Sequence, residues 1–329
     1  MRFARNSFLE PAASLIVLSI LFASIWCNSA CSQTPKAIKI VTPVPPGGSL
    51  DILARLVADQ IGRASRGPII TIENRPGGGG VVGTEVVARA APDGSTLLIA
   101  ATSILISPYL QKVNYDPLST FEPICELADV PTVIVVNAAS PYRTLTDLID
   151  AARVKPGELT LASVGPGTPY QFGFEALKRA ANVDVTYIPF SGSAPAVNAL
   201  LGQHVTAVFA GFPNVAELIA AGKFRALAVA ARARTESLPE APTVAEAGYE
   251  DREVENWFGL FAPAKTPKET VSQLSEWFAT AVQAPELRPK LLAQGLFPIA
   301  KCGADFANLL RKQYDDYGRV IRDLKVKRE

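Results

Sequence analysis

Histidine is nearly absent from this sequence of 329 residues, in which His204 is the single one. Catalysis by Ser–His or Cys–His pairs and His-rich metal sites both depend on this residue type. His204 stands in Leu-Gly-Gln-His-Val without an evident Ser or Cys partner, and we interpret it as a structural residue in a surface turn. The acidic residues are scattered and form no ligand string for zinc or calcium. We therefore expect no metal and no cofactor.

An excess of charge of one sign is also lacking, since 32 Lys and Arg residues face 31 Asp and Glu residues. Without Arg2, Arg5 and Glu10, which all precede position 31, the two signs balance. No basic stripe or basic patch interleaved with aromatic residues is present. The sequence therefore predicts no nucleic-acid partner.

The first thirty residues have the order of a secretory signal peptide. Arg2 and Arg5 are followed by an apolar stretch from Ala12 to Trp26, and then by small residues at Ser29 and Ala30. The apolar stretch is shorter than the roughly 20 residues that span a membrane. We expect residues 1–30 to be removed after Ala30 and the remainder to be periplasmic. Lipid anchoring at Cys31 is the alternative.

Cysteine is scarce, and only Cys125 and Cys302 lie beyond the signal region and its boundary. An exported protein can form disulfides, but the sequence cannot show whether two residues so far apart come close enough. We expect two separate buried thiols.

Beyond the signal region, strand and helix patterns alternate, which predicts an α/β fold with mixed, mostly parallel sheets. The expected strands are Ile38–Val41, Ile69–Ile72, Thr96–Ala100, Thr132–Val136, Leu159–Ala162, Val185–Ile188, Ala207–Phe209, Ala226–Ala230 and Trp257–Phe261. The expected helices are Leu50–Arg63, Gly83–Arg89, Leu145–Arg153, Tyr170–Ala180, Pro195–Leu201, Ala216–Ala220, Lys268–Ala281, Glu286–Gln294 and Ala304–Leu324.

Two continuous apolar runs, Thr132–Val136 and Trp257–Phe261, could be long strands that pass from one domain to another. The middle of the chain would then be inserted into a domain made of both ends, with a cleft and a two-strand hinge. We expect lobe 1 to comprise residues 36–133 and 256–329, and lobe 2 to comprise residues 134–255.

The most informative stretch is Gly47-Gly48-Ser49-Leu50-Asp51, which follows an apolar strand pattern and opens a helix pattern. Ser49 suits the N-cap position. A strand, a glycine turn and a helix together direct free N–H groups and the positive end of the helix dipole at one place, which suits an anion. An ordinary βα turn has the same sequence features. Asp51 could act as a general base, or it could simply interact favourably with the helix dipole.

Other turns place small and hydroxyl residues after strands. Gly78–Gly83 formally fits the dinucleotide pattern G-x-G-x-x-G, but the next strand ends in Ile99-Ala100-Ala101-Thr102 without the required acid, so we interpret it as a surface loop. The turns at 101–103, 163–168 and 190–193 expose amides and hydroxyls where open α/β sheets bind ligands, although βα turns commonly look like this.

Many ordered pieces of the chain resemble the Bug family, the extracytoplasmic solute-binding proteins of tripartite tricarboxylate transporter systems. The resemblance runs from about Ile38 to the C-terminus. Its pieces are Pro46–Asp51 with Ala54-Arg55, Glu73–Gly79, Val87–Gly94, Tyr115–Pro117, Lys155–Gly157, Ile188–Gly192, Ala221–Ala228, Pro242–Gly248, Trp257–Pro263 and Thr266-Pro267.

The resemblance implies a two-lobed periplasmic-binding-protein fold of type II and a non-enzymatic receptor that binds a small carboxylate between its lobes. We also expect a monomer whose partners are the membrane components of a tripartite tricarboxylate transporter or a sensor protein. The alternative is an exported α/β hydrolase-like enzyme that uses Asp51 as base. The ligand-binding residues implied by position are Val44, Pro46, Gly47, Gly48, Ser49, Asp51, Thr102, Ser103, Ser163, Gly165, Gly167, Thr168 and Ala210.

The sequence departs from its relatives at two places near these residues. Gln171 replaces a histidine that many relatives have, and Ala210-Gly211 replaces an Asp-Asn pair. The loss of that aspartate makes a ligand with an amino group less suitable, and the sequence does not identify the carboxylate.

Overall fold

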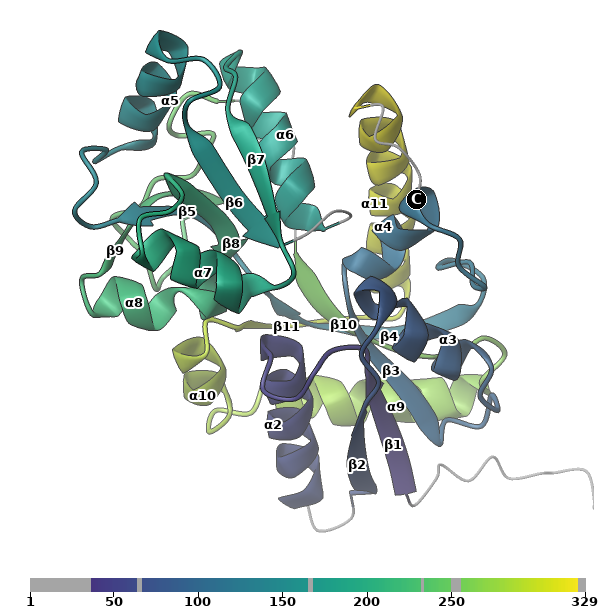
Figure 1. Ribbon diagram of the computed structural model, residues 1–329. Coiled ribbons are helices and arrows are strands. Elements are labelled where there is room, and N and C mark those ends of the chain that lie inside the picture. Colours follow the sequence, from purple (N-terminus) through teal and green to yellow (C-terminus); the bar gives the residue numbers. More distant parts are fainter. Residues whose placement is uncertain (1–36, 64–66, 165–167, 232–233, 250–255, 325–329) are drawn as a thin grey trace, which may run out of the picture. The chain divides into compact units, whose positions relative to one another are not determined.

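The computed structural model describes residues 37–63, 67–164, 168–231, 234–249 and 256–324 (Figure 1). All of them belong to the compact unit Thr34–Glu329. The expectations for the signal peptide and for Cys31 lie outside the described residues. In the part of the chain that is described, no helix combines the length and the apolar character needed to cross a bilayer.

The first of two sheets has six strands in the order β11-β4-β10-β3-β1-β2. β1 pairs in parallel with β2 and β3, whereas β10 is antiparallel to β3 and β4, and β11 is antiparallel to β4. Its strands come from both ends of the described chain. Their bounds are β1 Ala37–Thr42, β2 Ile69–Asn74, β3 Thr96–Ala101, β4 Phe121–Asp129, β10 Trp257–Pro263 and β11 Phe297–Cys302.

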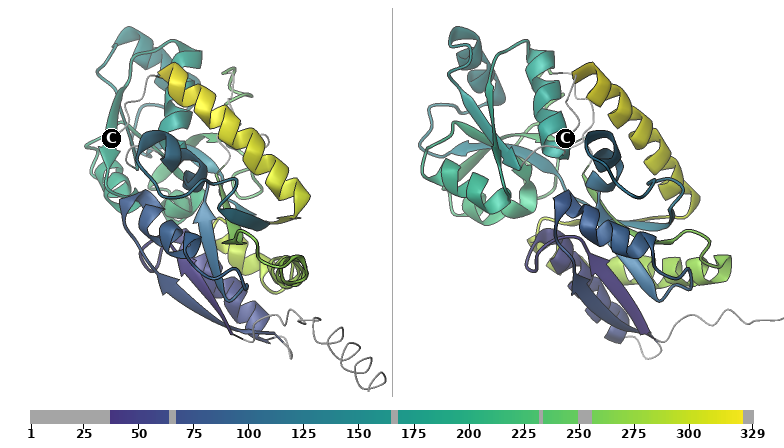
Figure 2. Two further views of the ribbon diagram at one scale, coloured as in Figure 1. Left: turned by 90° about the vertical axis from the view of Figure 1, so that its right-hand side faces the viewer. Right: turned by 45° about the vertical axis from the view of Figure 1, so that its right-hand side comes forward.

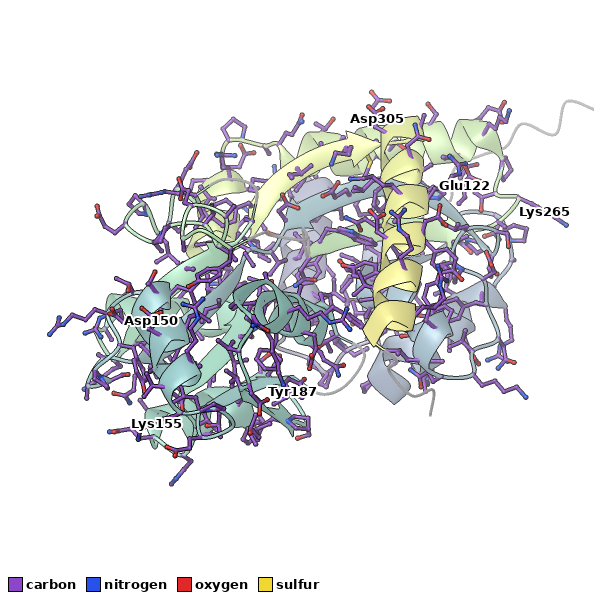
Figure 3. The ribbon with its side chains drawn as sticks, turned by 90° about the horizontal axis from the view of Figure 1, so that it is seen from above. Glu122, Asp150, Lys155, Tyr187, Lys265 and Asp305 are labelled. Carbon is purple, nitrogen blue, oxygen red and sulfur yellow. A yellow bond between two sulfur atoms is a disulfide. The ribbon has the colours of Figure 1, made fainter. Side chains whose placement is uncertain are left out.

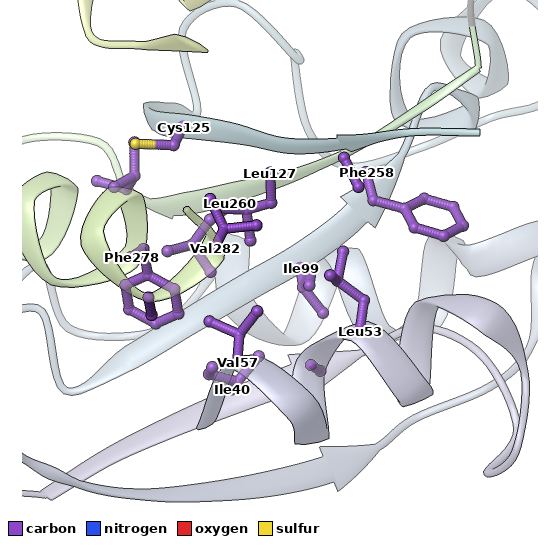
Figure 4. Packing of buried hydrophobic residues seen from close by; sticks show 14 of the residues in the cluster. Ile40, Leu53, Val57, Ile99, Cys125, Leu127, Phe258, Leu260, Phe278 and Val282 are labelled. Carbon is purple, nitrogen blue, oxygen red and sulfur yellow. The ribbon is translucent and has the colours of Figure 1, made fainter. Parts of the chain in front are cut away.

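Helices cover both faces of this sheet. On one face α2 (Ser49–Arg63), α9 (Lys268–Val282) and α10 (Arg288–Ala293) bury an apolar cluster that includes Leu53, Val57 and Phe278 (Figure 4). On the other face α3 (Val81–Ala88), α4 (Ser103–Leu110) and α11 (Ala304–Leu324) pack around Trp257 and Phe306. Figure 2 shows α11 as one long continuous helix. A 3₁₀ turn, Gly78–Gly80, precedes α3.

The second sheet has five strands in the order β7-β6-β8-β5-β9, all from the middle of the chain. α5 (Leu145–Val154) and α6 (Pro169–Ala181) share an apolar cluster with one face, and α7 (Ser193–Leu201) and α8 (Ala216–Ala220) with the other. A 3₁₀ turn, η3 (Phe212–Asn214), follows β8. The strand bounds are β5 Thr132–Asn137, β6 Thr160–Val164, β7 Thr186–Phe190, β8 Ala207–Gly211 and β9 Phe224–Ala230.

The sheets are mixed, as predicted, but parallel pairs do not predominate. Three of the five pairings in the first sheet and two of the four in the second are antiparallel. The reason is that β10 and β5, the strands next to the passages between sheets, lie inside the sheets and run against both of their neighbours.

The predicted strands Thr132–Val136 and Trp257–Phe261 are present, but neither continues from one sheet into the other, so the interpretation as crossing strands is wrong. The first is part of β5, and the second is part of β10. Between β4 and β5 the chain passes through Val130 and Pro131, and a proline has no N–H with which to continue a ladder. The exact lobe boundaries remain a prediction.

Cys125 and Cys302 form a disulfide, which corrects the expectation of two separate thiols. They are direct partners in the antiparallel pairing of β4 with β11, and their Cα atoms are 4.0 Å apart. Figure 4 shows the bond beside the apolar cluster that α2 and α9 cover. The sequence separation of 177 residues means that this bond closes a very long loop.

Candidate functional site

The turn after β1 leads directly into α2 and is the most exposed part of the predicted site. Pro46, Gly47 and Gly48 are exposed, and Val44 and Ser49 are partly buried. The backbone N–H of Ile52 donates to the carbonyl oxygen of Gly48, so Gly48 occupies the N-cap position that was predicted for Ser49. Gly47 has a φ of 84°, a conformation that favours glycine.

Asp51 fixes this turn from inside. The residue is 2% exposed, and its carboxylate accepts hydrogen bonds from Gly47 N–H (2.9 Å), Arg55 Nε and Nη2 (both 2.9 Å) and Asn74 Nδ2 (2.8 Å). Asn74 also donates to Thr42 Oγ1 at 2.7 Å and to the carbonyl oxygen of Val44 at 3.1 Å. Because the network joins the ends of β1 and β2 to the first turn of α2, it determines the path of the chain between them.

The surroundings of Asp51 exclude it as a general base. Burial alone would raise the pKa of Asp51, but the hydrogen bonds from Arg55, Gly47 and Asn74 outweigh burial and hold the pKa below its ordinary value. A carboxylate that is already paired and weakly basic cannot readily take a proton. The N–H group of Gly47 already donates to Asp51, so it does not point freely at a ligand, and a ligand contact by Gly47 remains a prediction.

We predict that Asp51→Asn destabilises the protein by roughly 1–3 kcal/mol at pH 7, because an amide NH2 would face the donors of Arg55 and Asn74. The lowered pKa means that the carboxylate of Asp51 stabilises the fold above its unfolded-state pKa, and that this stabilisation is lost as pH falls through the lower folded-state pKa. The stability difference between parent and variant should therefore shrink in acid. Urea unfolding at pH 7 and below about pH 4 measures it, and a difference that is independent of pH would contradict the role of Asp51.

The next strand of the same sheet brings Thr102 and Ser103 to the same edge. β3 runs parallel to β1, so the two carboxyl ends meet there. Thr102 is fully buried, and its Oγ1 accepts a hydrogen bond from the backbone N–H of Trp257 at 3.0 Å. Ser103 is partly buried and is the first residue of α4, a helix that the sequence analysis missed. Thr102 thus connects β3 to the start of β10.

Ser163 lies at the carboxyl end of β6 in the second sheet. It is fully buried, and its Oγ has no hydrogen-bond partner among the described residues. It lies beside Tyr187, which is labelled in Figure 3. Burial raises the pKa of Tyr187 to about 12, and the nearby Ser163 hydroxyl partly offsets this rise. The contact between the two hydroxyls does not have the geometry of a normal hydrogen bond. A buried hydroxyl without a partner is energetically costly, and this suits a ligand-binding role.

The other predicted residues of the second sheet are less informative. Gly165 and Gly167 lie outside the described residues. Thr168 is the N-cap residue of α6. Ala210 is buried, and its methyl group belongs to the apolar cluster on the α7 face of the sheet, so its side chain does not share a face with Ser163.

Sequence reasoning missed Asn256 and Tyr170, which connect the two sheet edges. The carbonyl oxygen of Asn256 accepts from Val130 N–H at 2.7 Å, and its Nδ2 donates to the Tyr170 hydroxyl at 3.0 Å. Asn256 immediately precedes Trp257, whose N–H binds Thr102, so the edges with Thr102 and with Tyr170 meet at this point. No motif indicated these residues, because their contacts depend on how the segment between β4 and β5 lies against the segment that leads into β10.

The remaining observations limit the chemistry of the site. Within the described ranges, no group of three or more His, Cys, Asp and Glu side chains could hold a metal ion. His204 is exposed in the turn before β8, as predicted. A small apolar cavity, lined mainly by residues of α5, α6 and β6, shares no residue with the predicted site. The predicted residues themselves offer hydroxyls, backbone amides and the N-terminus of α2.

Comparisons with known proteins agree on one family. Residues 53–326 match the family described as "Tripartite tricarboxylate transporter family receptor". The protein BugT of Bordetella pertussis is 31% identical over 302 residues, which cover 91% of this chain and 92% of BugT.

Two solved structures of Rhodopseudomonas palustris proteins are similar over most of their lengths. Rpa4515 with adipate is 30% identical, with a TM-score of 0.79 and coverage of 87% of this chain and 96% of that one. MatC with bound malate is 29% identical, with a TM-score of 0.74 and coverage of 87% and 98%. The fold is therefore that of a type II periplasmic binding protein, and the chain belongs to the family of tripartite tricarboxylate transporter receptors.

Proposed function

We propose that this protein is an extracytoplasmic receptor that captures a small carboxylate between its two sheets, for uptake by a tripartite transporter or for sensing. Its family consists of non-enzymatic periplasmic binding proteins, and two solved relatives hold adipate and malate. The Cys125–Cys302 disulfide supports export, since such bonds persist in oxidising compartments. Removal of residues 1–30 is part of this proposal.

The observation that carries the proposal is the preorganised turn at the start of α2. Asp51 holds the turn through Gly47, whereas no described backbone carbonyl accepts from the N–H groups of Gly48 and Ser49. Exposed N–H groups at a helix N-terminus stabilise an anion. The charge of Asp51, which would otherwise repel a carboxylate, is balanced by Arg55.

The ligand contacts on the first sheet are proposed to come from Gly48 and Ser49, with Val44 and Pro46 beside them and Thr102 and Ser103 at the end of β3. On the second sheet they are proposed to come from Ser163 and Thr168. Since these groups are neutral, hydrogen bonds and dipoles, rather than a lysine or arginine, would hold the carboxylate.

Calorimetry and thermal unfolding with a panel of carboxylates test the function. The panel contains malate, succinate, adipate and benzoate, with glucose as a control that has no carboxylate. We expect at least one carboxylate to bind and to raise Tm, because a ligand specific to the native state stabilises it. Chromatography after incubation should recover that compound unchanged. Turnover of any member, or binding of glucose alone, would contradict the proposal.

A further inference from the structure

Thr132, the first residue of β5, has a buried hydroxyl with nothing to bind. The residue is 1% exposed, and its Oγ1 has no hydrogen-bond partner among the described residues. A buried hydroxyl normally has a partner, because removing it from water without one is costly. Thr132 directly follows the Val130–Pro131 passage between the sheets, so the unpartnered hydroxyl lies where the two sheet edges meet.

A glycine across the ladder leaves room beside this hydroxyl. Thr132 pairs with Gly211 in the antiparallel ladder of β5 and β8, so side chains at the two positions would lie on the same face. A Cβ atom on Gly211 would lie 2.7 Å from the Tyr170 hydroxyl oxygen and 3.3 Å from Asn214 Nδ2. The Tyr170 hydroxyl and the Asn214 amide therefore border the space that a side chain at 211 would fill, and Thr132 is the cross-strand partner of that position.

The Tyr170 hydroxyl is held in this place and stays protonated. Asn256 Nδ2 donates to it at 3.0 Å, and burial raises the pKa of Tyr170 to about 12. Asn256 is also the residue before Trp257, whose N–H binds Thr102. The adjacent residues Asn256 and Trp257 therefore connect Tyr170 to Thr102, which is a residue of the proposed carboxylate site.

We propose that Thr132, Tyr170 and Asn214, arranged around Gly211, form a neutral subsite that binds one carboxylate oxygen of the ligand. The inference rests on the proposed function and names further residues of the same site. Hydroxyl and amide groups donate hydrogen bonds, and none of these side chains carries a negative charge that would oppose a carboxylate. Tyr170 is the specificity-determining member. Its hydroxyl has room in the subsite only because residue 211 is a glycine without a side chain.

The stability of the ligand-free protein gives the first test. Thr132→Val keeps the shape of the side chain and removes a buried hydroxyl that has no partner, so we expect Tm to rise by about 1–3 °C. Thr266→Val is the matched control, because Thr266 is also buried but its Oγ1 donates to Pro263 at 2.7 Å. We expect Tm of that variant to fall. A fall in Tm for Thr132→Val would show that the hydroxyl serves the fold, for example through a bound water, and would overturn the subsite.

Binding gives the second test, with malate and adipate as probes. We expect Thr132→Val and Tyr170→Phe each to weaken the tighter-binding probe by at least about tenfold, because each loses a hydrogen bond to a charged oxygen. Thr266→Val should bind like the parent. Parent-like affinity in Thr132→Val and Tyr170→Phe would overturn the subsite and leave the receptor function intact. A parent protein that binds no carboxylate of the panel would overturn the function, and the subsite with it.

A compensating pair of substitutions keeps the subsite testable if Tyr170→Phe alone is unstable. Gly211→Ala places a methyl group 2.7 Å from the Tyr170 hydroxyl, so one of the two must move. We expect Gly211→Ala to lower Tm and weaken binding in the parent, and to lower Tm much less when Tyr170→Phe is also present. Additive losses of Tm would show that the two residues do not share this space and would overturn the assignment of Tyr170.

Discussion

Replacing both Cys125 and Cys302 with alanine is expected to lower Tm by about 5–15 °C. The disulfide joins neighbouring antiparallel strands across a sequence separation of 177 residues, so its loss frees a very long loop in the unfolded chain. Removing a native disulfide typically costs about 2–5 kcal/mol, and each kcal/mol shifts Tm by about 2–4 °C for a chain of roughly this size. Differential scanning calorimetry of the parent and the double variant measures the shift.

Reduction provides the control for the alanine variant. A reductant should lower Tm of the parent toward that of the double variant and leave the double variant unchanged. Carboxylate affinity at low temperature should be similar in both proteins, because neither cysteine belongs to the proposed site. Equal Tm values for parent and double variant under oxidising conditions would show that the bond does not stabilise the fold.

The disulfide also shows what the sequence could not supply. The two cysteines meet because β4 and β11 pair with Cys125 opposite Cys302. Neither strand was predicted from the sequence. β4 carries Glu122, Pro123 and Glu126 within its nine residues, and β11 contains Pro298 and Lys301, so neither shows a clean strand pattern. Strands whose apolar residues are the buried ones, such as β1 and β5, were predicted to within one residue at each end.

Only the local geometry of the candidate site could be predicted from the sequence, and its contact with a ligand remains a prediction. The glycine turn before α2 and the small residues after β3 and β6 could be recognised because local rules place exposed amides and hydroxyls there. The role of Asp51 could not be, because it depends on Asn74, which arrives from the end of β2. Thr132, Tyr170 and Asn256 were missed for the same reason, since each matters only through a partner that is distant in sequence.

Gly48→Asp is expected to weaken binding of any carboxylate that the parent binds by at least tenfold. Gly48 is exposed at the N-terminus of α2, beside the amides proposed to hold the carboxylate. A new carboxylate there would occupy the helix N-terminus and repel the ligand. A lost hydrogen bond to a charged group is worth about 1.5–3 kcal/mol, and 1.4 kcal/mol corresponds to tenfold in affinity.

The structure makes this substitution a clean test of charge. A Cβ atom on Gly48 would meet nothing closer than 3.8 Å, and Gly48 does not have the positive φ of Gly47, so a side chain fits without strain. Gly48→Asn, of the same size but neutral, should therefore lose much less affinity than Gly48→Asp, and His204→Ala should lose none. Calorimetry on the three variants, with circular dichroism to confirm folding, separates the causes. Equal losses for Asn and Asp would mean that the side chain blocks the ligand by bulk, and a folded Gly48→Asp protein with parent-like affinity would place the carboxylate elsewhere.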